Sequence, residues 1–403
     1  MYPDFVEIPA GMPDALRRNL RLGGDEKFRI CYLSLANDVA RVQHFWVNGE
    51  GDPRSQKATY AGMFFKLVEK LDAEGMMVST FDTEPPESQP VRIARVEHSE
   101  SGAIASQTVE HVRAFQPHLV VVSPSVPIEI VPQIVEICPT IFYAHSLLYP
   151  RNWAMPSASF KQRIRRFVRI RRGRKKLCGL SGILGSSDFA LTQMREVTKS
   201  GLPVGVTFNQ YISPPAPRSP QSGRRLLYVG AFDVVSGADL LVEAFKEARK
   251  AVPELTLTMI GTGPLNETLL RAAEQVDGLE IVVGYDRHKM DVALANSDLV
   301  IAADRFEGMQ ALPIFLPEAL MNGVPALISS ATPARETEQE HCAVFKAGEL
   351  KDLERQIVRL SSDQSSYAEL RRNLPMPPGS HYDRSQSWGS GIVRLIGEIF
   401  KIS

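Results

Sequence analysis

Short apolar runs rich in β-branched residues alternate with segments of helical periodicity along most of the chain. Runs that are apolar at successive positions are typical of strands buried on both faces of a parallel sheet. The pattern therefore predicts parallel sheets with helices on both faces. In the first half the predicted strands are 29–35, 77–81, 119–122, 140–144, 182–184 and 204–208. The predicted helices among them include 57–71, 106–115 and 189–198.

A proline-rich segment, 209–223, interrupts this alternation and carries four prolines between Pro214 and Pro220. Dense proline favours an extended, semi-rigid connector, so we expect a linker here between a domain 1–208 and a second domain 224–385. Beyond the linker the predicted strands are 226–229, 255–260, 281–283, 299–302 and 326–328. Predicted helices open at Gly237 and Pro264, and a last helical period covers 388–400.

Composition changes this picture little. The 403 residues carry 46 Lys and Arg against 46 Asp and Glu, so no net charge indicates a nucleic-acid partner. The four cysteines lie far apart, without the spacing of a metal site, and we expect reduced, buried thiols. The N-terminus lacks a signal-peptide pattern, and prolines and glutamates break the most apolar region, 119–148. We expect a soluble cytoplasmic protein, or one that is peripheral at the inner face of a membrane.

The segment 297–329 carries the strongest functional signal. Its apolar run ends in Asp304-Arg305-Phe306-Glu307-Gly308, and a helical stretch with Glu318 follows before another apolar run. Ligands of open parallel sheets bind where strands end and helices begin. A glutamate at such an edge can accept hydrogen bonds from two hydroxyl groups, as sugar or ribose binding requires.

This segment resembles the signature of retaining GT-B glycosyltransferases of the "glycosyl transferases group 1" family, Ser-Arg-x-Glu-Gly-Phe-Gly followed by Glu-Ala-x-x-x-Gly-x-Pro-Val. Three earlier segments resemble the same family in the same order: YVGAFDVVSGADLLVEAF, LTMIGTGPLNETL and LEIVVGYDRHKMDVALANSDLVIAA. The alternative is an α/β sheet whose glycines only form turns. The resemblance implies an α/β GT-B fold, with two Rossmann-like doubly wound domains facing each other across a cleft. In that plan the C-terminal helix, 386–403, completes the first, acceptor-side domain, and 224–385 binds the sugar nucleotide.

The resemblance implies a hexosyltransferase-type enzyme that moves a sugar from a nucleotide sugar, UDP-linked in our expectation, to a hydroxyl acceptor with retention. Polysaccharide, lipid-linked glycan or natural-product acceptors fit this class. It implies no cofactor and no metal. Glu307 and His145 would contact the donor sugar, and Glu318 the ribose. The backbone at Gly308, Met309 and Gln310 would face sugar and phosphate, and Tyr285 the base. The remaining donor-side positions are Gly230, Ser236, Gly237, Gly261 and Gly263.

The chain departs from the family pattern in two ways. Ala231 and Ser236 stand where the family usually has the Arg and Lys that hold the diphosphate, and each lost charge-assisted bond costs about 1.5–3 kcal/mol. We expect Arg287, His288, Lys289 or Arg305 to substitute. The two glutamates also flank ten residues instead of seven. A non-catalytic GT-B protein that binds a glycan or a partner transferase is therefore the alternative function, and a sugar-nucleotide epimerase is a third.

Each candidate residue in the first domain has a structural interpretation as well as a functional one. His145 follows a strand, where it would contact the donor sugar or a neighbouring carbonyl group. Asn37 and Asp38 are acceptor-side candidates or ordinary turn residues. The segment 161–176 holds ten basic residues and no acid, interleaved with apolar positions. It predicts contact with an anionic membrane or a lipid-linked acceptor, through residues such as Arg165, Arg166 and Arg169; a solvated helix face and an RNA-binding patch are the alternatives.

Overall fold

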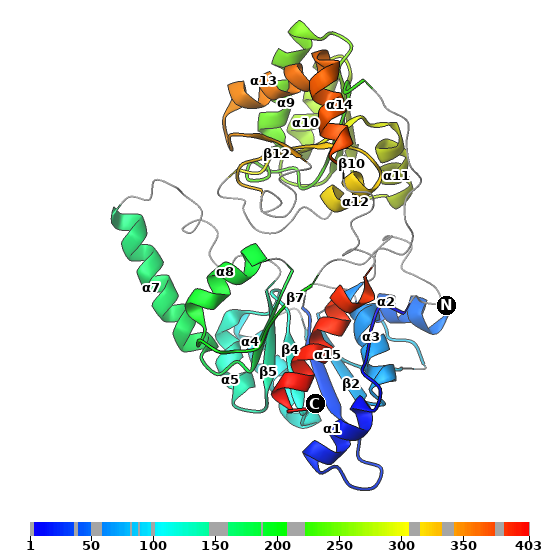
Figure 1. The fold of residues 1–403 in the computed structure, drawn as a ribbon, viewed down its shortest axis with the longest axis vertical. Helices are drawn as coiled ribbons and strands as arrows, with labels where there is room; N and C mark the ends of the chain where they lie inside the picture. The colour runs from blue at the N-terminus through cyan, green and yellow to red at the C-terminus, as the bar shows by residue number, and fades with distance from the viewer. Residues whose placement is uncertain are drawn as a thin grey trace. The chain divides into compact units, whose positions relative to one another are not determined.

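The computed structural model describes residues 4–35, 39–49, 59–80, 83–87, 89–97, 101–144, 160–186, 188–207, 222–305, 315–332, 342–374 and 383–402. They belong to two compact units, coloured blue to green and green to orange in Figure 1, with the red C-terminal helix in the first. The described parts of 4–144, 164–207 and 383–402 form the first unit, and those of 222–374 form the second.

Within the described residues, a parallel seven-stranded sheet forms the first unit, in the order β3-β2-β1-β4-β5-β6-β7. The central strands β4 and β5 are buried at every position, which is why apolar runs identified them. The strands are β1 (Arg29–Leu33), β2 (Glu74–Ser79), β3 (Arg92–Arg95), β4 (Leu119–Val122), β5 (Thr140–Ala144), β6 (Gly182–Gly185) and β7 (Val204–Val206).

Helices cover both faces of this sheet. The helical segments are α1 (Met12–Leu20), α2 (Val39–Val47), α3 (Tyr60–Lys70), α4 (Ser101–Phe115), η1 (Ile128–Ile130), α5 (Val131–Val135), α7 (Phe160–Leu177), α8 (Asp188–Val197), η6 (Arg384–Gln386) and α15 (Trp388–Ile399). One core joins the sheet to α1, α2, α3 and α15, and another joins its opposite face to α4, α5, α8 and the C-terminal end of α7. Successive strand residues enter opposite cores: Cys31 and Leu33 face one, Ile30 and Tyr32 the other.

The C-terminal helix α15 packs on α3, β6 and β7, and Figure 1 shows it lying among the first elements of the chain. Trp388, at its start, is 1% exposed. Its ring centroid lies 5.0 Å from that of Tyr32, 5.7 Å from Tyr60 and 6.2 Å from Tyr143. The end of the chain is thus part of the core of the first unit.

In the second unit the described strands form a parallel six-stranded sheet in the order β10-β9-β8-β11-β12-β13. They are β8 (Arg225–Val229), β9 (Thr256–Gly261), β10 (Leu279–Val283), β11 (Leu299–Ala302), β12 (Ala326–Ser329) and β13 (Cys342–Phe345). The helices are α9 (Ala238–Ala251), α10 (Asn266–Gln275), α11 (Arg287–Asn296), α12 (Phe315–Met321), α13 (Leu350–Ser362) and α14 (Gln364–Arg372). Helices α9, α10 and α13 cover one face, and α11 and α12 cover the other.

Both sheets are parallel with helices on both faces, which confirms the predicted α/β class with two Rossmann-like domains. Periodicity did not predict β3 or β13. Both are four-residue strands at a sheet edge, and Arg92 and Arg95 make β3 partly polar. The expectation of buried thiols is wrong for Cys178, which is exposed just beyond the end of α7. Among the described helices, none combines the length and the apolar character needed to cross a membrane.

Candidate functional site

The strand order of the second sheet reverses between β8 and β11. In open parallel sheets this reversal opens a crevice at the carboxyl ends of the two strands, because the chain leaves them toward opposite faces. The chain leads from β8 to α9 on one face and from β11 to α12 on the other. The described residues of the predicted donor site lie on the segments that follow β8, β9, β10 and β11.

Glycines allow these segments to pack backbone against backbone. A Cβ atom built at Gly237 would lie 2.1 Å from the carbonyl oxygen of Ala303, and one at Gly261 would lie 1.9 Å from that of Gly230. At Gly263 the nearest contact would be the carbonyl oxygen of Phe232, at 2.5 Å. Gly237 also has a φ of +73°, which favours glycine. The glycine spacing seen in the sequence therefore has a structural cause in the contacts between loops.

The turn that opens α9 is bound to the residue that follows β11. The backbone N–H of Arg305 donates to Val235 O at 2.9 Å, and its guanidinium donates to Val234 O and to Asp239 Oδ2, the latter at 2.9 Å. Arg305 occupies the Arg position of the family signature. It brings a cation to the start of α9, beside Ser236, where the usual Lys is missing.

A carboxylate of the protein already uses one donor of this turn. The backbone N–H of Ser236 donates to Asp233 Oδ1 at 2.7 Å. Tyr228, on β8, is buried below the turn and donates its hydroxyl to Ala231 O at 2.7 Å. Burial raises the pKa of the Tyr228 phenol, and the negative charges of Asp304 and Asp233 raise it further. The start of α9 is thus an ordered turn with acidic neighbours.

Asp304 is the acidic neighbour that sequence reasoning missed. Burial raises its pKa to about 6; the hydroxyl of Thr332, which donates to Oδ2 at 3.1 Å, opposes this rise, and the negative charge of Asp233 adds to it. The signal was present in the sequence, since Asp304 stands at the Ser position of the family signature.

Arg287 and Glu318 form a buried ion pair between α11 and α12, on the face of the sheet opposite to α9. Arg287 is the first residue of α11, and its Nη2 donates to Glu318 Oε1 on α12 and to Asp291 Oδ1 one turn further along α11. The side chains of Arg287 and Glu318 are 12% and 6% exposed. Burial lowers the pKa of Arg287, but the hydrogen bonds to Glu318 and Asp291 outweigh it, so the pKa is raised overall.

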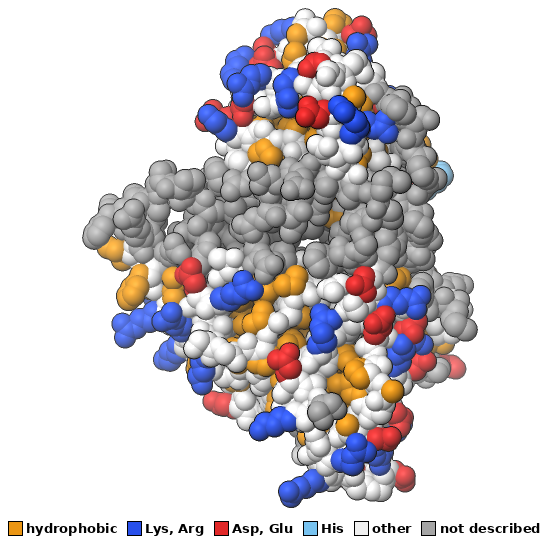
Figure 2. Space-filling model, viewed as in Figure 1, with side chains coloured by type: hydrophobic (Ala, Val, Ile, Leu, Met, Phe, Trp, Pro, Cys, Tyr) orange, Lys and Arg blue, Asp and Glu red, His pale blue; other side chains and the backbone are white. Residues whose placement is uncertain are grey.

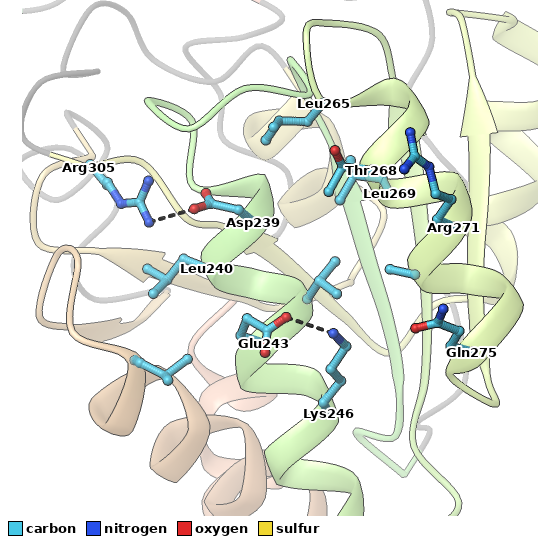
Figure 3. Close-up of a pocket in the computed structure, with 13 residues that line it drawn as sticks. Asp239, Leu240, Glu243, Lys246, Leu265, Thr268, Leu269, Arg271, Gln275 and Arg305 are labelled. Atoms are coloured by element: carbon cyan, nitrogen blue, oxygen red, sulfur yellow. Dashed lines mark hydrogen bonds and ion pairs between the residues drawn. The ribbon is translucent and has the colours of Figure 1, made fainter.

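Two surface grooves lie on the second unit. The first, of about 370 Å³, runs between α9 and α10 over an apolar floor that includes Leu240, Leu265 and Leu269. Figure 3 shows the Arg305–Asp239 ion pair at one end of this groove and the Glu243–Lys246 pair further along α9. The second groove, of about 530 Å³, lies beside α11 on the face of β8, β9 and β10, with His288 and Lys289 in its lining.

The remaining predicted residues fall into three groups. Tyr285, expected to face the base, lies after β10 and is 57% exposed. Arg169 is half-buried on α7, while the side chains of Arg165 and Arg166 lie outside the described part of that helix. His145, Asn37, Asp38, Glu307, Gly308, Met309 and Gln310 lie outside the described residues. Within the residues that are described, no group of three or more His, Cys, Asp or Glu side chains could hold a metal ion.

Sequence comparison finds similar proteins for the second unit. Residues 211–375 match the family model "Glycosyl transferases group 1". A GDP-mannose-dependent alpha-(1-6)-phosphatidylinositol monomannoside mannosyltransferase from Mycolicibacterium smegmatis is 32% identical over 108 residues, 25% of this chain and 28% of the relative. A glycogen synthase from Thermus thermophilus is 32% identical over 83 residues, 20% of this chain and 19% of the relative. The chain thus matches less than a third of the length of these relatives.

Structure comparison covers both units. Sucrose-phosphate synthase from Thermosynechococcus elongatus aligns with a TM-score of 0.63 at 14% identity, over 93% of this chain and 98% of that one. Anabaena HepE in complex with UDP and glucose aligns with a TM-score of 0.58 at 13% identity, over 93% of this chain and 99% of that one. At these identities the likeness concerns the fold, that of GT-B glycosyltransferases. Over residues 211–375 this chain is similar to the glycosyl transferases group 1 family.

Proposed function

We propose that this protein transfers a sugar from a nucleotide sugar to a hydroxyl group of an acceptor. The observation that carries the proposal is Glu318, a buried carboxylate at the switch-point edge of a domain that matches the family model. Such a carboxylate is suited to binding hydroxyl groups of a ribose or sugar. The family resemblance favours retention without a metal or cofactor, and HepE, whose structure holds UDP, favours a UDP-linked donor.

The chemistry requires stabilisation of the negative charge that grows on the departing diphosphate. Arg305 supplies a guanidinium at the start of α9, and the dipole of this fourteen-residue helix adds positive potential there. In a retaining transfer, an oxygen of the leaving phosphate accepts the proton of the acceptor hydroxyl as the new glycosidic bond forms on the same face. Glu307 and His145 would hold the donor sugar during this step, and Asn37 and Asp38 would face the acceptor.

The alternative is a GT-B protein that binds a glycan or a partner transferase without catalysis. This alternative is favoured because carboxylates of the protein already accept hydrogen bonds from the donors at this edge. Asp233 accepts from the N–H of Ser236, and Asp239 accepts from Arg305. Two further carboxylates accept from Arg287. A diphosphate has to compete with these groups for the same donors.

A thermal-shift screen against UDP-, GDP- and dTDP-sugars separates the two functions, since a ligand that binds only the folded state raises its stability. We expect one donor class to stabilise the protein and the Glu307→Ala variant to lose transfer with unchanged unfolding. Glycan binding without any response to nucleotide sugars would establish the non-catalytic alternative. Full transfer by Glu307→Ala protein would remove the assigned role of that residue.

We also propose that α7 contacts an anionic membrane surface. Ile164, Phe167 and Val168 are 48%, 65% and 40% exposed, and the exposed Arg171 and Lys175 continue the same outward stripe at helical spacing. In Figure 2 orange apolar atoms adjoin blue basic ones along the described part of this helix. Exposed apolar side chains beside cations favour the interface of an anionic bilayer.

The C-terminal end of α7 is fixed to the first unit, because Leu177 is buried in the core, Lys176 pairs with Glu129 and Arg174 donates to Glu196 O. We expect binding to vesicles that contain phosphatidylglycerol and weaker binding at high salt. Replacing Arg171 and Lys175 by Gln should weaken it, whereas the same change of charge at Arg18 and Arg21 of the first unit should not. Equal binding to neutral and anionic vesicles would contradict this proposal.

A further inference from the structure

We infer that Arg287 positions the Glu318 carboxylate for the vicinal hydroxyl groups of a ribose, and does not bind the diphosphate. This inference rests on the proposed function, because it assigns the selectivity of the nucleotide site. Arg287 opens α11, where Asp286 caps the helix by accepting from the N–H of Lys289 at 3.0 Å. Its guanidinium reaches across to α12, so one residue ties the two helices on this face of the sheet.

Glu318 is held in place by the packing of its helix, α12, and by the guanidinium of Arg287. Every residue of α12, Phe315–Met321, is buried, so the helix cannot turn to carry the carboxylate into water. A carboxylate with a 6% exposed side chain needs an opposite charge close by, and Arg287 supplies it at Oε1. Among the described residues, none donates to Oε2. That oxygen remains an acceptor with a fixed position.

The charge of this cluster excludes a phosphate. Arg287 contributes one positive charge, while Glu318 and Asp291, both bound to its Nη2, contribute two negative ones. A net negative cluster repels an anion but binds a neutral hydroxyl donor.

The same cluster also offers a donor. The Nε of Arg287 is buried and has no hydrogen-bond partner in the part of the chain that the structure describes. Buried donors are rarely left unpaired, so this N–H is suited to a ligand oxygen. A vicinal diol would supply both partners, a hydroxyl donor for Glu318 Oε2 and an acceptor oxygen for Arg287 Nε.

The experiment compares ribose and 2′-deoxyribose nucleotides. Calorimetry of the full chain would give the affinities of UDP and GDP, of dUDP and dGDP, and of inorganic pyrophosphate. For the nucleotide that binds, we expect the wild-type protein to prefer the ribose form by about tenfold or more, as one charge-assisted hydrogen bond provides. Arg287→Met should abolish most of this preference and leave pyrophosphate affinity unchanged. Arg287→Lys should restore part of it, and Arg271→Met, the same kind of change at an exposed ion pair, should have no effect.

Three results would overturn the inference. If Arg287→Met lowers the affinities of ribose nucleotide, deoxyribose nucleotide and pyrophosphate by the same factor, Arg287 binds the diphosphate. If the preference survives in Arg287→Met while the protein unfolds more easily, the pair is only a clamp between α11 and α12. If wild-type protein binds neither UDP nor GDP, the proposed function fails together with this inference. Glu318→Gln gives an independent check. It should also reduce the preference for the ribose nucleotide, and adding Arg287→Met to it should reduce this preference no further, because the two residues act together.

Discussion

The carbonyl oxygen of Ala303 would lie 2.1 Å from a Cβ atom at Gly237. The backbone of the turn that opens α9 therefore packs directly against the backbone that follows β11. Together with the hydrogen bond from Arg305 N to Val235 O, this contact fixes the two loops of the switch point relative to each other. The backbone at this edge of the sheet is therefore fixed, and it holds the side chain of Arg305 in place.

Gly237→Ala should destabilise the second unit by about 2–4 kcal/mol, because the methyl group overlaps backbone and the φ of +73° is unfavourable for alanine. Gly284→Ala is the matched control: its φ is +98°, but a Cβ there meets nothing within 4 Å, so only the backbone cost of about 1–2 kcal/mol applies. Urea unfolding followed by circular dichroism would measure both. Equal losses in the two variants would show that the contact with Ala303 relaxes freely.

Asp298→Ala should also destabilise the second unit, by about 1–3 kcal/mol, because it leaves partly buried donors without their acceptor. The Asp298 side chain is 0% exposed and accepts from the N–H groups of Arg224 and Arg225, each at 3.1 Å, and from Arg225 Nη2 at 2.8 Å. These bonds attach the beginning of β8 to the beginning of β11. Asp277→Ala removes an exposed carboxylate from the same unit and should change the unfolding free energy little. A small effect of Asp298→Ala would mean that water replaces the carboxylate.

The stability of the second unit should depend on pH through Asp304. Its pKa of about 6 in the folded protein lies above the ordinary value of 3.8, so folding favours the protonated form. The stabilisation from this proton is complete below pH of about 4 and is lost as pH rises through about 6. Asp304→Asn should therefore gain stability relative to wild type, by about 1–3 kcal/mol, between pH 4 and pH 7.5. A difference in unfolding free energy that stays constant over this range would contradict the assignment.

Trp388→Ala should destabilise the first unit by about 3–5 kcal/mol, since it empties a site that is closed by Tyr32, Tyr60 and Tyr143. Trp388→Phe keeps an aromatic ring in the site and should cost less. Far-UV circular dichroism during chemical unfolding would measure both effects, because it does not depend on the tryptophan that is removed. If Trp388→Ala were no worse than Trp388→Phe, α15 would be held mainly by its aliphatic residues.

Strand positions could be predicted from the sequence wherever a strand is covered on both faces. The runs 119–122, 140–144 and 299–302 agree with β4, β5 and β11 residue for residue. The edge strands β3 and β13 were missed: both have only four residues, and β3 carries Arg92 and Arg95 at its ends. In the second unit the helices predicted to open at Gly237 and Pro264 correspond to α9 and α10, because glycine and proline mark the turns of a doubly wound sheet.

The amino-acid sequence by itself determined the fold class, and it indicated the family resemblance and the sheet edge of the candidate donor site, because periodicity, glycine spacing and signature residues are local properties of the chain. Only the tertiary structure decided which charges meet. Arg287 was one of four residues offered for the phosphate; α11 and α12 pack on the same face and place it against Glu318, 31 positions away. Arg305 and Asp239, 66 positions apart, meet for a similar reason. Ion pairs between distant residues depend on how helices pack, and that geometry is encoded by the whole core and not by any one segment.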